Sequence, residues 1–396
     1  MYNQTMYELG SQPSIIRELF AYGLQQAKVV GPEKVFDYTL GNPSIPAPAK
    51  VNQSIKDILD DTDSIAIHGY SMAGGFDGTR EAIANNLNER YGTDIKASNL
   101  FITCGAAPAL ISAIKALLVD ENSEIMVVAP FFPEYRPFIT KNGGKLVVIP
   151  ADREHFQIDL AKVEALITKN TQAIIINSPN NPSGVVYTEE TLKALADILT
   201  KKGEEYGHPI YIIADEPYRE LVYGDVKVTF IPTVYKNTIV CYSWSKSLSL
   251  PGERIGYVCV PDQCDNAKEV FDGVSGAARA GGHVCAPTML QMVIERCVGE
   301  MPDLKAYDEN RTLLYDELTK MGYKCAKPDG AFYLFVEVPN GDGMAFCQKA
   351  KEDHNLLVVP GEGFDCPGYM RLSYCVANDM IKRSLPAFQK MYDAYK

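Results

Sequence analysis

The sequence has 396 residues, of which 46% are hydrophobic and 22% are charged, and its formal net charge is −12. This length is too great for one ordinary hydrophobic core, so we expect two domains or one large α/β unit with a smaller unit attached. The acidic balance and the absence of any Lys/Arg run argue against a nucleic-acid-binding surface.

The sequence also argues against export, membrane insertion and metal binding. Its N-terminus lacks a basic segment followed by an apolar one, and no stretch of about 18 apolar residues occurs. The ten cysteines are scattered from Cys104 to Cys375, without a Cys-x-x-Cys motif or a Cys/His cluster. We therefore expect reduced thiols, no metal site and a cytoplasmic protein.

The first part of the chain alternates between helical and strand patterns. A polar arm over residues 1–13 precedes a helix expected over residues 14–30, and further helices are expected over residues 77–91, 107–119 and 189–201. Short apolar strands are expected over residues 125–129, 145–149, 172–177, 210–214, 238–242 and 255–260. This alternation predicts an α/β fold with a mostly parallel sheet sandwiched by helices.

The pattern changes after about residue 295. A helix is expected over residues 302–321, strands over residues 331–338, 356–359 and 370–375, and a last helix over residues 378–395. We assign residues 1–48 to an N-terminal arm and small-domain segment, residues 49–295 to a large domain and residues 296–396 to a small α+β domain. Because no long linker separates them, the domains should pack closely with a cleft between them.

Three candidate site residues or segments lie in the first third of the chain. The small residues of Thr-Cys-Gly-Ala-Ala, residues 103–107, precede a predicted helix and would let a phosphate approach its first N–H groups, although tight packing explains them equally well. Phe132 offers a flat apolar platform for an aromatic ring, or it is a core residue. Tyr70 offers a phenolic hydroxyl to a phosphate or a phenolate.

Two predicted strands end in polar motifs. Asn181, in Asn-Ser-Pro-Asn-Asn-Pro-Ser-Gly, is either a turn residue or an amide that donates to a ligand oxygen. Asp215 ends a buried strand at the sheet edge where open α/β folds bind ligands, and Tyr218 follows it. The Asp215 carboxylate would keep a nearby pyridine nitrogen protonated, whereas a helix cap or a salt bridge is the structural alternative.

The most informative stretch is residues 242–257, Tyr-Ser-Trp-Ser-Lys-Ser-Leu-Ser-Leu-Pro-Gly-Glu-Arg-Ile-Gly-Tyr. Hydroxyls such as that of Ser243 can converge with the Arg254 guanidinium on phosphate oxygens. Partly desolvated beside fixed cations, Lys246 would have a lowered proton affinity and act as an amine nucleophile toward a carbonyl. A solvated Ser/Lys loop is the alternative.

Arg371 lies within an apolar strand, in Tyr-Met-Arg-Leu-Ser-Tyr. An unpaired charge is costly there, so we expect a carboxylate partner. That partner is either a ligand or a structural Asp or Glu.

Taken in chain order, these residues make the sequence resemble the class I/II aminotransferases, which are fold-type I pyridoxal-phosphate enzymes, over nearly its whole length. The most specific part is Ser-x-Ser-Lys followed, after seven residues, by Arg-x-Gly, and Asn-Pro-Ser-Gly with a later Asp-Glu-Pro-Tyr strengthens it. The resemblance implies a transaminase that moves an amino group between an L-amino acid and a 2-oxo acid by a ping-pong mechanism. It also implies pyridoxal 5'-phosphate as cofactor, held by the large domain, and a homodimer with shared active sites.

The resemblance further implies roles for individual residues. Lys246 would hold the cofactor as an internal aldimine, Asp215 would pair with its ring nitrogen, and Arg371 would bind the substrate α-carboxylate. The remaining expected contacts are Asn181 and Tyr218 to the ring's 3'-oxygen, Phe132 to the ring face, Ser243, Arg254 and the backbone of Ala106 and Ala107 to the phosphate, Tyr70 to the phosphate of the neighbouring subunit, and Gly41 on a segment that closes over the substrate.

One position departs from the family pattern. Where related prokaryotic aspartate aminotransferases carry a lysine for the distal carboxylate of the substrate, this chain has Ala107. Aspartate as the substrate is therefore in doubt. Arg279 is a candidate to replace that lysine, but its surroundings do not align clearly with the family pattern. Two other functions remain open: a carbon–sulfur β-lyase on the same scaffold, and a non-catalytic ligand sensor.

Overall fold

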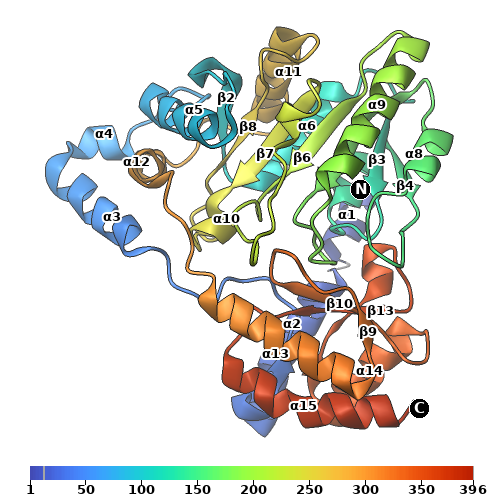
Figure 1. The fold of residues 1–396 in the computed structure, drawn as a ribbon. Helices are drawn as coiled ribbons and strands as arrows, with labels where there is room; N and C mark the ends of the chain where they lie inside the picture. The colour runs from blue at the N-terminus through green and yellow to red at the C-terminus, as the bar shows by residue number, and fades with distance from the viewer. Residues whose placement is uncertain (12–13, 396) are drawn as a thin grey trace.

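The computed structural model describes residues 1–11 and 14–395. Figure 1 shows a large sheet with helices in its upper half and a smaller sheet with the C-terminal helices in its lower half. The polar arm expected over residues 1–13 contains a helix, α1 (Gln4–Ser11), all of whose residues are exposed. Residues 12 and 13 of that arm lie outside the described residues.

The large sheet has seven strands, and all but one run parallel. Only β8 is antiparallel to its two neighbours, β2 and β7. The predicted mostly parallel sheet is therefore confirmed. The strand order is β2 (Leu100–Thr103), β8 (Gly256–Cys259), β7 (Thr238–Ser243), β6 (Tyr211–Asp215), β5 (Thr171–Asn177), β3 (Glu124–Val128) and β4 (Lys145–Ile149).

Both faces of this sheet are apolar, which explains the continuous hydrophobic runs of its strands. Ala173 and Ile175 of β5 pack on the face covered by α6 (Ala106–Leu117), α7 (Tyr135–Thr140) and α11 (Ala267–Ala280). Ile174 and Ile176 point to the other face. The helices that pack on that face are α5 (Asp77–Tyr91), α8 (Leu160–Leu166), α9 (Glu189–Tyr206) and α12 (Thr288–Cys297).

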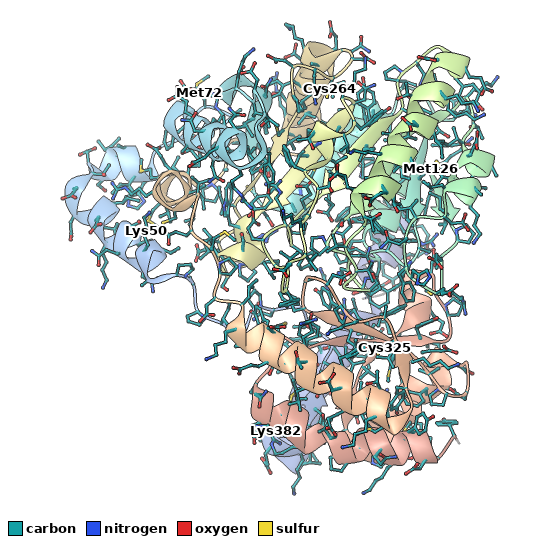
Figure 2. All side chains as sticks on the ribbon, in the orientation of Figure 1. Lys50, Met72, Met126, Cys264, Cys325 and Lys382 are labelled. Atoms are coloured by element: carbon teal, nitrogen blue, oxygen red, sulfur yellow. The ribbon has the colours of Figure 1, made fainter. Side chains whose placement is uncertain are left out.

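Two helices without a prediction from the sequence, α3 (Ala49–Asp61) and α4 (Ser64–His68), extend away from the sheet beside α12. Figure 2 labels Lys50 at the start of this projection and Met72 in the loop that follows it. Ile65, Tyr70 and Met72 are exposed by 80% or more although they are large and apolar. This projection therefore presents an uncovered apolar surface.

The second sheet is antiparallel and has the order β12 (Val359–Pro360), β13 (Tyr369–Ser373), β10 (Tyr333–Glu337) and β9 (Lys324–Cys325). Helices α13 (Lys305–Met321), α14 (Gly343–His354) and α15 (Asn378–Asp393) belong to the same half (Figure 1). The single strand expected over residues 356–359 is divided between β11 (Leu356–Leu357) and β12, which belong to different sheets.

The N-terminal segment joins this lower half. Strand β1 (Phe36–Asp37) pairs in parallel with β11, and α2 (Ile15–Val30) packs on β11 and β12. The boundaries assigned at residues 48 and 295 remain predictions. The short helices η1 (Pro32–Lys34), η2 (Ala97–Asn99), η3 (Ile231–Thr233), η4 (Gly361–Phe364) and α10 (Trp244–Ser247) complete the described elements.

Two kinds of feature are absent from the described residues. No helix among them is long and apolar enough to cross a membrane. No group of three or more His, Cys, Asp or Glu side chains among them is arranged to hold a metal ion.

Candidate active site

A cavity of about 300 Å³ is lined by residues from both halves of the molecule. Strands β5, β6 and β7 end at it with Asn177, Asp215 and Ser243, so the carboxyl edge of the large sheet forms one wall. Arg371 of the central strand β13 comes from the smaller sheet. The expected cleft at the sheet edge is therefore present.

Lys246 lies in α10, which starts directly after β7. Its Nζ donates a hydrogen bond of 2.6 Å to the carbonyl oxygen of Gly41 and lies 5.6 Å from the centre of the Phe332 ring. Burial lowers the pKa of this amine to about 8, and the charges of Arg371 and Arg254 contribute to the lowering. The amine is thus neutral far more often near neutral pH than an ordinary lysine.

Asp215 is 5% exposed, and its two carboxylate oxygens have different surroundings. Oδ2 accepts a hydrogen bond from the Tyr135 hydroxyl, and the Asn177 amide donates to the Asp215 carbonyl oxygen over 2.8 Å. Oδ1 has no hydrogen-bond partner among the described residues. Burial raises the pKa of the carboxyl to about 7 despite the Tyr135 hydrogen bond, because no cation among the described residues offsets the cost of burial.

Arg371 is 2% exposed and has no carboxylate partner among the described residues. Its Nη1 donates to Oδ1 of Asn181 over 3.0 Å, its Nη2 donates to the Thr39 carbonyl oxygen, and its Nε has no partner. The guanidinium lies between the rings of Tyr333 and Phe364, 4.7 and 4.9 Å from their centres. Burial lowers its pKa. The structural Arg–Asp/Glu alternative is therefore wrong.

An anion cradle lies at the N-terminus of α6. Gly105 precedes the helix with a φ of +94°, and a Cβ built on it would lie 2.7 Å from Nη2 of Arg254. Ala106 and Ala107 form the first turn, whose N–H groups lack helical partners, and both line the cavity. Ser243 lies on the same wall and donates to the Ser245 hydroxyl over 3.1 Å. Two hydroxyls, a guanidinium and a helix start therefore converge.

Aromatic groups supply other parts of the wall. Phe132 is partly exposed and lines the cavity. The Tyr218 hydroxyl is 2.9 Å from that of Tyr333, and both side chains also line it. Burial raises the pKa of Tyr218 well above its ordinary value, so the hydroxyl is neutral.

All the residues to which the resemblance assigned a role in the site line this cavity, except Tyr70. Tyr70 follows α4, is 87% exposed and is not among the residues that line the cavity. Sequence reasoning missed Tyr135, Tyr333 and Thr39 as neighbours of the site. Tyr135 lies three residues after Phe132 in the segment Pro-Phe-Phe-Pro-Glu-Tyr, residues 130–135, from which only Phe132 was selected as a candidate.

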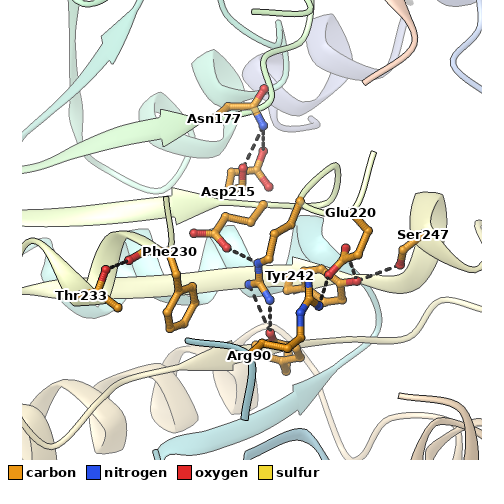
Figure 3. Close-up of polar contacts among 11 residues, drawn as sticks. Arg90, Asn177, Asp215, Glu220, Phe230, Thr233, Tyr242 and Ser247 are labelled. Atoms are coloured by element: carbon orange, nitrogen blue, oxygen red, sulfur yellow. Dashed lines mark hydrogen bonds and ion pairs between the residues drawn. The ribbon is translucent and has the colours of Figure 1, made fainter. Parts of the chain in front are cut away.

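A polar network of buried and partly exposed residues contacts Ser247, the last residue of α10 (Figure 3). Glu220 accepts hydrogen bonds of 2.8 Å from Arg90 and from the Tyr242 hydroxyl. The same Tyr242 hydroxyl lies 2.8 Å from Oγ of Ser247, the residue after Lys246. These contacts fix the turn that carries Lys246.

The arrangement fits pyridoxal 5'-phosphate on two independent observations. The unpaired Oδ1 of Asp215 matches a protonated ring nitrogen, and the Gly105 cradle has room for an anion that a Cβ would fill. The Lys246 amine, whose pKa is lowered, lines the same cavity and suits reaction with an aldehyde carbon.

Comparisons with known proteins agree with this chemistry. Residues 34–388 match the family model described as aminotransferase class I and II. A probable aspartate aminotransferase of Methanocaldococcus jannaschii is 32% identical over 96% of this chain and 98% of its own length. An aminotransferase structure from Eubacterium rectale has a TM-score of 0.98 with 54% identity, covering 100% of this chain and 99% of that one.

A Thermotoga maritima aspartate aminotransferase structure has a TM-score of 0.86 with 31% identity, covering 99% of this chain and 100% of its own. The matches do not favour the carbon–sulfur lyase. This chain belongs to the class I and II aminotransferase family and is a pyridoxal-phosphate-dependent transaminase that acts on amino acids and 2-oxo acids.

Proposed function

We propose that Lys246 is the catalytic amine of this transaminase and that the cavity around it is the active site. One observation carries the proposal: the Lys246 amine, with its pKa lowered to about 8, shares a cavity with an unpaired carboxylate oxygen of Asp215. Burying an amine and a carboxylate without partners lowers the stability of the protein, so such groups are expected where a ligand binds them.

Each cofactor contact is assigned to a residue that lines the cavity. Asp215 would hold the ring nitrogen, Asn181 and Tyr218 the 3'-oxygen, and Phe132 the ring face. The phosphate would be bound by Ser243, Arg254 and the N–H groups of Ala106 and Ala107. When bound, pyridoxal phosphate supplies an aldehyde and an electron sink for the electrons of the substrate Cα–H bond.

The protein's own groups then orient the substrate and move its proton. Arg371 binds the α-carboxylate, for which its unpaired Nε and buried position suit it, and Asn181 orients the guanidinium through Nη1. Nζ of Lys246 takes the proton from the substrate Cα as a general base. Leu40 and Gly41 also line the cavity, and the carbonyl oxygen of Gly41 accepts the hydrogen bond from Lys246. We assign substrate binding to Gly41 together with Asn181 and Arg371.

We further propose a homodimer in which Tyr70 completes the site of the partner subunit. The exposed position of Tyr70, outside its own cavity, and the exposed neighbours Ile65 and Met72 support this arrangement. A cytoplasmic location is proposed from the ten cysteines, all of which are free thiols.

Replacement of the amine tests the catalytic assignment. Lys246→Ala is expected to abolish transamination and the absorbance shift that marks cofactor bound through the lysine. Lys236→Ala, at an exposed lysine paired with Asp265, is the matched control and should leave both unchanged. If Lys246→Ala retains either property, the assignment is wrong.

A mixing experiment tests the shared site. The Lys246→Ala protein should be inactive and the Tyr70→Ala protein poorly active. Random mixing of their subunits should restore about a quarter of wild-type activity, because half of the dimers then hold one intact site. Failure of mixing to restore activity, in subunits shown to exchange, would place Tyr70 outside the partner's site.

A further inference from the structure

The residues that line the cavity fall into two chemical groups. Every charged or hydrogen-bonding side chain of the lining belongs to the reacting centre or contacts a residue that does. The remaining lining side chains are apolar, and they include Ile16, Leu40, Ala107, Leu110, Phe132 and Pro251. The space left for the substrate's own side chain is therefore bounded by hydrocarbon.

The cations that one subunit contributes to the lining leave none over for a second carboxylate. In the described structure the cavity lining contains three cations, Lys246, Arg254 and Arg371. Under the proposed function they serve the aldehyde, the phosphate and the α-carboxylate. Arg279, considered from the sequence as a replacement for a distal-carboxylate lysine, is exposed in the last turn of α11 and is not part of the lining.

The apolar wall is built from three separate parts of the chain. Ala107 and Leu110 are three residues apart in α6 and share a helix face. Ile16 comes from α2, where it packs against the apolar cluster that contains Phe335 and Phe364. Leu40 directly follows Thr39, whose carbonyl oxygen accepts from Arg371. The wall therefore adjoins the group assigned to the substrate α-carboxylate.

We propose that the preferred amino donor carries an uncharged, apolar side chain, aliphatic or aromatic, that packs against Ile16, Leu40 and Leu110. This inference rests on the proposed function and narrows it. A donor such as aspartate would place an ionised carboxylate against this wall without a cation, and an unpaired buried charge is strongly disfavoured. A leucine or phenylalanine side chain would instead bury its apolar surface against the wall, which is favourable.

The half-reaction tests this directly. The cofactor-loaded enzyme is mixed with one amino acid at a time, without an acceptor, and the cofactor absorbance is followed. Leucine, methionine or phenylalanine should convert the cofactor at least about tenfold more efficiently than aspartate or glutamate. Equal or greater efficiency with aspartate overturns the proposal. Conversion by none of these amino acids overturns the proposed function instead.

A binding measurement separates the two failures. Calorimetry compares isocaproate, an apolar monocarboxylate, with maleate, a dicarboxylate, on the same loaded enzyme without turnover. Isocaproate should bind at least about tenfold more tightly. If maleate binds as well or better, the side-chain assignment is wrong whether or not the enzyme turns over.

Variants at Ala107 supply the second test. Ala107→Lys adds an amine to the cavity wall and should raise the ratio of aspartate to leucine efficiency at least about tenfold. Ala107→Met adds similar length without charge and should not raise it. An equal rise in both variants overturns the charge argument.

Discussion

Tyr135 donates a hydrogen bond through its hydroxyl to Oδ2 of Asp215, while Oδ1 of the same carboxylate has no partner among the described residues. Asn177 holds the backbone of Asp215 from the neighbouring strand, with which it pairs in register. The carboxylate is thus fixed on one side and open on the other. Under the proposed function, the open oxygen is the one that meets the cofactor ring nitrogen.

Removal of the Tyr135 hydroxyl should weaken the carboxylate as a partner for that nitrogen. The hydrogen bond lowers the Asp215 pKa against the larger effect of burial, so Tyr135→Phe is expected to raise that pKa further in the cofactor-free protein. A hydrogen bond to a charged group contributes about 1.5–3 kcal/mol, so kcat should fall roughly 10- to 100-fold. Carboxyl ¹³C chemical shifts report the pKa, and steady-state kinetics report kcat.

The matched control is Tyr187→Phe, which removes another buried hydroxyl, one that is not among the donors to Asp215 in the described structure. It should leave both readouts near wild type. An unchanged Asp215 titration in Tyr135→Phe would show that the contact does not tune the carboxylate.

Asp215 also predicts an opposition between stability and activity. In the cofactor-free protein its pKa is raised from 3.8 to about 7, so the folded state binds more protons than the unfolded state between these values. The contribution of the protonated Asp215 to the free energy of unfolding is therefore complete below about pH 4. It is lost as the pH rises through about 7. At higher pH, Asp215→Asn should be up to ~4 kcal/mol more stable than wild type.

Urea unfolding of both cofactor-free proteins from acid to mildly alkaline pH measures this difference. The same variant should be nearly inactive when loaded with cofactor, because a neutral amide does not hold a ring nitrogen in its protonated form. A difference in unfolding free energy that does not change with pH would show that Asp215 titrates normally in the folded protein.

The sequence located residues whose role follows from local context and missed those whose role depends on a distant partner. Lys246 and Arg254 stand in one short motif, and Asp215 ends a recognisable apolar strand. Tyr135 contacts Asp215 across 80 positions, and Thr39 contacts Arg371 across 332. The pattern of polarity along the chain does not reveal such pairs. They form when the chain folds, and predicting them requires the order of the strands.

The fold divides in the same way. Strands β3 to β8 were predictable because they are short and apolar, and amphipathic helices separate several of them. Strands β1 and β11 have two residues each and exist through their pairing with one another, 320 positions apart. Helix α3 contacts α12 and buries one stripe at helical spacing, Val51, Ser54 and Ile58. That spacing is visible in the sequence, so α3 was predictable although no helix was expected there.

The lowered pKa of Lys246 predicts unusual reactivity in the cofactor-free protein. Burial is the main cause, and the amine should therefore gain reactivity up to about pH 8 and then level off. Lys193, whose pKa is raised by a hydrogen bond from its amine to Glu189, is an internal control whose reactivity should continue to rise above that pH. Acetylation with acetic anhydride across this pH range, followed by peptide mass spectrometry, compares both lysines in one sample. If the acetylation of Lys246 and Lys193 rose with pH in the same way, the lowered pKa of Lys246 would be contradicted.

The glycine at the start of α6 gives the sharpest test of the anion cradle. Ala at position 105 would be strained at a φ of +94°, and its Cβ would lie 2.7 Å from Nη2 of Arg254, which would have to move. Because the change acts on the phosphate contacts, Gly105→Ala should weaken pyridoxal 5'-phosphate at least about tenfold, while pyridoxal, which lacks the phosphate, should be affected little.

Gly92→Ala is the matched control for this strain. Gly92 also has a positive φ, +66°, at the end of α5, but no atom lies within 4 Å of a Cβ built there. It should lower stability by about 1 kcal/mol without changing the ratio of the two affinities. Fluorescence titration with each ligand measures that ratio. An equal loss of affinity for pyridoxal and its phosphate in Gly105→Ala would show that the glycine supports the fold around Arg254, not the recognition of the anion.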